Sequence, residues 1–132
     1  MLAGMIEKCA AVILQNRRLL VVRKHGTSVF ISPGGKTAPG ETQFECLRRE
    51  LKEELSVELT HARPFGTFDR PSALEDGMVR IHVWFTTIVG KCTACAEIEE
   101  IRWITGADKL PLGSVFAECV IPELVRLGHL HA

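Results

Sequence analysis

The sequence predicts a layered α/β or α+β domain, and three features predict it. Short apolar runs of strand length recur along the chain, the longest at 79–89. Two segments, 42–55 and 114–127, have the character of helices instead. The length of 132 residues, with no repeat and no linker-like tract, fits one domain over 1–132. Strands interleaved with two helices are typical of layered packing.

The N-terminal third is expected to hold two strands and a long loop. Residues 8–14 and 18–23 are apolar runs separated by Gln-Asn-Arg, which predicts a hairpin or meander. Residues 25–40 contain four glycines and two prolines, so we expect mostly loop there, with a short strand at 29–31.

A helix is predicted over 42–55. Thr42 and Glu45 match a capping box, in which each side chain bonds the backbone amide of the other. Apolar residues recur at spacings of three and four and predict one buried face: Phe44, Leu47, Leu51 and Leu55.

The second half of the chain is predicted to be mainly strand. A strand region begins at 57–59 and continues beyond a loop at 62–64, followed by the long strand at 79–89. A short strand is expected at 99–104, and a helix at 114–127 closes the chain.

Composition excludes several classes of protein. Basic and acidic residues number 16 each, which argues against general affinity for nucleic-acid polymers. No apolar run is long enough to cross a bilayer and the start shows no signal-peptide pattern, so we expect a cytoplasmic protein without a membrane partner.

Five scattered cysteines suit reduced thiols. The pair Cys92 and Cys95 lacks the partners of a zinc site and is interpreted as two small strand or hairpin residues.

The predicted helix carries three acids on one side. At about 100° per residue, Glu50, Glu53 and Glu54 share an arc away from the apolar face. Like charges this close weaken a helix. A solvated acidic face would explain them without any function. A site for hard divalent cations, which prefer carboxylate oxygens, would explain them as well.

The preceding loop favours the cation site. Pro33-Gly34-Gly35 permits close backbone approach, so that carbonyls can face a metal or amides a phosphate. Glu41 adds a fourth carboxylate just before the helix, and Arg49 lies among the acids.

In this order the residues resemble the signature of the Nudix hydrolase superfamily, over 35–57. Eight of its nine defined positions agree: Gly35, Glu41, Arg49, Glu50, Leu51, Glu53, Glu54 and Val57. The ninth, usually glycine, is Ser56, which we expect to adopt a left-handed turn at a cost of about 1 kcal/mol. The flanking strands and the segment 97–103 are also similar, and the short chain resembles the small MutT-like members.

The resemblance implies a fold and a reaction. The fold is an α/β/α sandwich with a mixed β-sheet, in which the signature forms a loop–helix–loop. The substrate is a nucleoside diphosphate linked to a group X, and water attacks its phosphoanhydride bridge. Mg²⁺ or Mn²⁺ would neutralise phosphate charge and activate that water.

The resemblance also implies roles for particular residues. Glu50, Glu53 and Glu54 are the expected metal ligands, with the Gly34 carbonyl, and Glu41 is a secondary member of the cluster. Arg49 would orient the carboxylates. The general base stays open among Glu53, Glu50 and Glu97, and Glu97 is equally well explained as a solvated acid.

Substrate contacts are expected outside the acids. Gly35 lies where backbone amides can face a phosphate. Arg23 would contact phosphate or base, or would simply be a surface charge. Phe30 would stack on a base, or would pack in the core. The five histidines show no metal-ligand spacing and are interpreted as surface or satisfied residues.

The favoured substrate is a nucleoside triphosphate or a modified one similar to 8-oxo-dGTP, giving a monophosphate and pyrophosphate. ADP-ribose or another nucleotide sugar is the alternative, weakly supported by Pro71, and the absence of tyrosine counts against dinucleoside polyphosphates. A non-catalytic nucleotide sensor is the alternative of another class. Homodimers are frequent in similar proteins.

Overall fold

The computed structural model describes residues 5–71 and 77–132. Their elements follow the chain as β1 (Met5–Val12), β2 (Leu14–Gln15), β3 (Arg18–Lys24), β4 (Gly34–Lys36), α1 (Gln43–Leu55), β5 (Glu58–Pro71), β6 (Met78–Val89), β7 (Ile98–Ile104), η1 (Phe116–Val120) and α2 (Ile121–Arg126). Among these residues no helix is long and apolar enough to span a membrane.

The strands form two sheets. One has the order β4-β1-β6-β5 and is mixed, because β1 and β6 are parallel while its other pairs are antiparallel. The other has the order β2-β3-β7 and is antiparallel. The predicted hairpin of 8–14 and 18–23 is confirmed only at its tip, where Leu14 pairs with Leu19.

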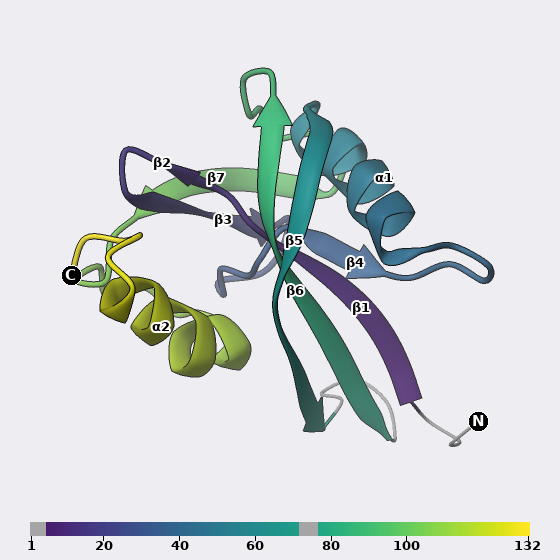
Figure 1. The fold of residues 1–132 in the computed structure, drawn as a ribbon. Helices are drawn as coiled ribbons and strands as arrows, with labels where there is room; N and C mark the ends of the chain where they lie inside the picture. Colours follow the sequence, from purple (N-terminus) through teal and green to yellow (C-terminus); the bar gives the residue numbers. More distant parts are fainter. Residues whose placement is uncertain (1–4, 72–76) are drawn as a thin grey trace.

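Helices cover the strands from opposite sides, with α1 on one side and the C-terminal helix, meaning η1 and α2 together, on the other (Figure 1). Side chains of β1 alternate between the two cores: Cys9 and Ala11, with Ile13 just beyond the strand, pack with α1, and Ala10 and Val12 pack with the C-terminal helix. Because both faces of the strand are buried, its sequence is a continuous apolar run. The predicted α/β/α sandwich is confirmed.

The segment 25–40 is mostly loop, as expected, but its short strand was predicted at the wrong place. The strand is β4, whose pairing to β1 supplies backbone bonds that a glycine pattern does not reveal, whereas 29–31 makes only isolated bridges. The expected loop at 62–64 lies inside β5. That edge strand continues past Pro64 by means of register shifts at Leu59/His61 and Pro64/Gly66.

Helix predictions were more accurate. Helix α1 has the predicted capping box at Thr42, but Phe44 is 41% exposed, whereas Cys46, outside the predicted apolar face, is fully buried. The C-terminal helix contains a π-helical turn that ends two residues before Pro122 in α2. Proline has no amide hydrogen to continue the α-helical ladder, which explains why the helix is irregular there.

Candidate active site

Helix α1 buries two of its three acids rather than presenting them to solvent. Glu50 is 9% exposed and Glu54 is 2% exposed, while the side chain of Glu53 is 56% exposed. The interpretation of a solvated acidic face is therefore wrong for Glu50 and Glu54. Buried carboxylates cost free energy unless they are paired or bind a cation, so their surroundings decide what they can do.

Strand β4 contacts both buried carboxylates through glycine. The Gly34 amide donates to Glu54 Oε1 at 3.0 Å. A side chain at Gly35 would place its Cβ 2.6 Å from Glu50 Oε1, a distance that real Cβ atoms do not tolerate. The backbone at Gly34 has φ +141°, and a Cβ there would meet the Cys9 carbonyl oxygen at 2.1 Å. Both glycines are thus required by close approach.

Arg49 holds the neighbouring acids in place. Its Nε and Nη2 donate to the two carboxylate oxygens of Glu41 at 2.7 and 2.8 Å, a bidentate pair. Its Nη1 donates to Glu50 Oε1 at 2.7 Å and lies 3.8 Å from Glu53 Oε2. This guanidinium lowers the pKa of the Glu41 carboxyl to about 2. The arrangement matches the orienting role expected for Arg49.

The two buried acids hold their protons more tightly than usual. Burial raises the pKa of Glu54 to about 8, against the opposing effect of the Gly34 amide, and the charge of Glu50 raises it further. Burial also raises the pKa of Glu50, although Arg49 opposes the shift. A nearby cation would lower both values, since it favours the ionised form.

Glu97 lies close enough to affect both acids. Its charge contributes to the raised pKa of Glu50 and to that of Glu54. It precedes β7, its carboxylate lies 3.7 Å from Lys24 Nζ, and its side chain is 60% exposed. The structure therefore brings together Glu97 and the acids of α1, which are more than 40 residues apart in the sequence.

The donor chemistry fits a hard divalent cation. Glu54 is buried, its pKa is high, and it accepts a hydrogen bond from the neutral Gly34 amide, so a positive charge would stabilise its ionised form. As the side chains stand, no group of three or more His, Cys, Asp or Glu within 5–71 and 77–132 could hold a metal ion. Glu53 accounts for part of this, because it points toward solvent.

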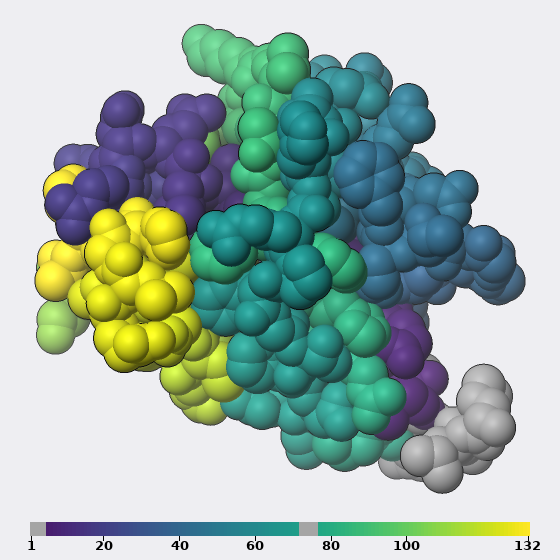
Figure 2. Space-filling model, in the orientation of Figure 1, coloured from purple at the N-terminus to yellow at the C-terminus, as the bar shows by residue number. Residues whose placement is uncertain are grey.

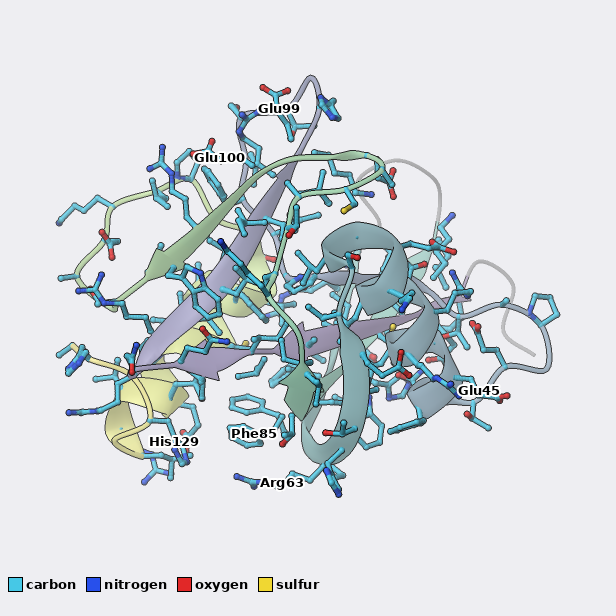
Figure 3. All side chains as sticks on the ribbon, turned by 90° about the horizontal axis from the view of Figure 1, so that it is seen from above. Glu45, Arg63, Phe85, Glu99, Glu100 and His129 are labelled. Carbon is cyan, nitrogen blue, oxygen red and sulfur yellow. The ribbon has the colours of Figure 1, made fainter. Side chains whose placement is uncertain are left out.

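Two residues expected to contact the substrate, Arg23 and Phe30, have protein partners in the structure. Arg23 pairs with Glu99 at 3.1 Å and Glu100 at 3.2 Å, so its charge is already neutralised; Figure 3 labels both acids. Phe30 is 4% exposed in the core, with the guanidinium of Arg102 5.2 Å from its ring centroid. Its burial favours the packing role for Phe30, and the stacking role stays a prediction. Gly35 makes room for Glu50.

Sequence reasoning missed one neighbour of the site. Cys9 in β1 and Cys46 in α1 are buried, and their Sγ atoms are 2.6 Å apart beneath β4. Burial and the Cys46 thiol raise the pKa of Cys9. Cys46 lies one helical turn before Glu50, which could have indicated it, but nothing in the sequence indicates that Cys9 lies opposite.

A comparison with protein-family models matches residues 5–123 to the NUDIX domain. The NAD-capped RNA hydrolase ndx-9 of Caenorhabditis elegans is 33% identical over 84% of this chain, which spans only 31% of that protein. The CTP pyrophosphohydrolase of Escherichia coli K12 is 31% identical over 80% of each chain.

A solved structure has a similar fold. The solution structure of the E. coli ORF135 protein superposes with a TM-score of 0.75 at 27% identity, covering 95% of this chain and 89% of that one. The family match spans both sheets, α1 and most of the C-terminal helix. The chain therefore belongs to the Nudix family, and it is an enzyme of that family's pyrophosphohydrolase class.

Proposed function

We propose that the protein hydrolyses a phosphoanhydride bond of a nucleoside triphosphate, giving a nucleoside monophosphate and pyrophosphate with the help of Mg²⁺ or Mn²⁺. The observation that carries the proposal is the pair Glu50 and Glu54, buried beside Gly34 and Gly35 with raised pKa values. The E. coli relative named a CTP pyrophosphohydrolase supports the choice of substrate.

Glu50, Glu53, Glu54 and the Gly34 carbonyl would hold the cation. The cation would supply charge neutralisation at the phosphates and a lower pKa for the attacking water. Arg49 keeps Glu50 oriented through the bond at 2.7 Å and keeps Glu41 beside it as the secondary acid.

The proton from the attacking water would go to a glutamate at the same site. Glu97 suits this role because it is exposed and lies near both buried acids. Glu53 and Glu50 remain the alternatives, and replacing each by glutamine separates them. Replacement of the general base should lower kcat and remove the acidic limb of the pH–rate profile. Replacement of a metal ligand should instead raise the metal concentration that gives half-maximal rate.

The test is release of monophosphate and pyrophosphate from a panel of substrates with Mg²⁺ or Mn²⁺. The panel contains the common and oxidised triphosphates, ADP-ribose and NAD. We expect turnover of triphosphates, and Glu54→Gln should lower it about 10³-fold because a buried ligand is lost. Glu58→Gln, a change at an exposed ion pair, is the matched control.

Other outcomes would change the proposal. Faster hydrolysis of ADP-ribose or NAD would move the substrate to a nucleoside diphosphate linked to X, as the name of the nematode relative suggests. Retained binding with no turnover of any substrate would make the protein a nucleotide sensor. Full activity of Glu54→Gln would contradict the metal assignment.

A further inference from the structure

A second concave site lies away from the acids of α1. It is a groove of about 400 Å³ where β5, β6, β2 and the segment after α2 meet. In Figure 2 the teal, purple and yellow segments that form it come together beside β5. Its lining contains no acidic residue: Leu14, His61, Ala62, Arg63, Phe85, Thr86, Thr87 and His129.

The centre of the groove is a stacked arginine. The Cζ of Arg63 lies 4.0 Å from the ring centroid of Phe85, and the ring of His129 meets Phe85 edge-on at 5.5 Å. Figure 3 shows these three side chains together, at the opposite end of the view from Glu99 and Glu100. One face of the guanidinium rests on the ring, and because Arg63 is exposed its other face is open.

Arg63 also has no acidic partner among residues 5–71 and 77–132. Within the part of the chain that the structure describes, it takes part in no salt bridge, whereas Arg23, Arg49 and Arg80 are each paired with carboxylates. A cation left unpaired in a groove without acids attracts an anion. The two histidines and the exposed hydroxyl of Thr87 add hydrogen-bonding groups around it.

These features together specify the ligand's chemistry. An open guanidinium face accepts a flat aromatic ring by stacking, and its edge with the neighbouring imidazoles accepts a phosphate. The volume is within the range of small-ligand sites. We propose that the groove is a second nucleotide site, which binds a nucleoside 5′-monophosphate without a metal, separately from the carboxylates.

The experiment is titration of the intact protein with AMP in EDTA, followed by backbone amide shifts in NMR and by calorimetry. We expect a Kd on the order of 0.1–1 mM, with the largest shifts at Arg63, Thr87 and His129. Arg63→Met should weaken AMP binding about tenfold, because methionine keeps the apolar contact with Phe85 and loses the charge and the planar face. Arg48→Met removes a charge from an exposed position on α1 and should leave the Kd unchanged.

Further titrations distinguish this site from the acids of α1 and identify the ligand. Glu54→Gln should bind AMP normally in EDTA even where it no longer hydrolyses nucleotides, so failure of one proposal does not imply failure of the other. Ribose 5-phosphate and inorganic phosphate should bind at least tenfold more weakly than AMP, on the order of the contribution of base stacking. Equal binding of phosphate, no binding of AMP, or shifts centred on Glu50 and Glu54 would each overturn the proposal.

Discussion

Helix α1 and the C-terminal helix cover opposite sides of the same strands, but only α1 buries carboxylates there. The side of the C-terminal helix that meets the strands is apolar, with Val120 and Leu124 fully covered. Helix α1 instead buries Glu50 and Glu54 beside Leu47 and Leu51. The C-terminal helix therefore packs through an apolar face alone, whereas α1 buries two carboxylates at a cost in stability.

Matched truncations of the two helices should give the largest effects. Leu51→Ala and Leu124→Ala each remove a side chain that is 0% exposed and should each lower the free energy of unfolding by about 2–5 kcal/mol. Only Leu51→Ala should also lower kcat, since Leu51 lies between Glu50 and Glu54. Urea unfolding and hydrolysis of the folded variants measure the two effects. Equal loss of kcat in both variants would contradict this difference between α1 and the C-terminal helix.

A second change tests the contact between α1 and β4. Gly35→Ala places a Cβ against the Glu50 carboxylate, so we expect hydrolysis to fall about 10²-fold through displacement of that acid. Gly113→Ala is the control, because its Cβ would be 3.6 Å from Ile31, an ordinary contact. Steady-state kinetics should show the loss in the first variant alone, and wild-type rates for Gly35→Ala would show that the close contact is dispensable.

The buried acids of α1 should make stability depend on pH. Because the pKa of Glu54 is raised to about 8, the folded protein keeps a proton that the unfolded chain releases near its ordinary value of 4.5. Stability without divalent cations should therefore fall as pH rises from about 5 to 8, by roughly 3–4 kcal/mol.

Urea unfolding in EDTA across this range measures the slope. Glu54→Gln should flatten it, whereas Glu53→Gln, which removes a carboxylate from the exposed side of the same helix, should keep it. A wild-type slope in Glu54→Gln would assign the dependence to other groups.

The end of α1 should give the smallest effect. Ser56 has φ 58° and ψ 38°, the left-handed conformation expected for it, and its amide bonds the Lys52 carbonyl. Ser56→Gly should raise the free energy of unfolding by about 1 kcal/mol, because glycine adopts this conformation without strain. Thermal unfolding measures it. Ser56→Ala keeps the Cβ and should give no gain, and a gain from alanine would place the cause elsewhere.

Local sequence patterns were sufficient to predict much of the fold. The capping box of Thr42 and Glu45 and the long strand at 79–89 were predicted correctly because neighbouring residues determine them. The strand β4 and the continuity of β5 through Pro64 were not, because both depend on partners distant in the sequence. Phe44 fitted the helical period yet is exposed, because periodicity alone does not say what packs against a helix face.

The same division between local and long-range information holds for the acids of α1. Their order and spacing with Gly35 and Arg49 are properties of the sequence and were sufficient to predict the family. Tertiary structure decided which of them are buried and which lie near Glu97, and it also brought Arg63, Phe85 and His129 together. The physical reason is that burial and long-range contact set the charge state and environment of a side chain, and neither is encoded in local spacing.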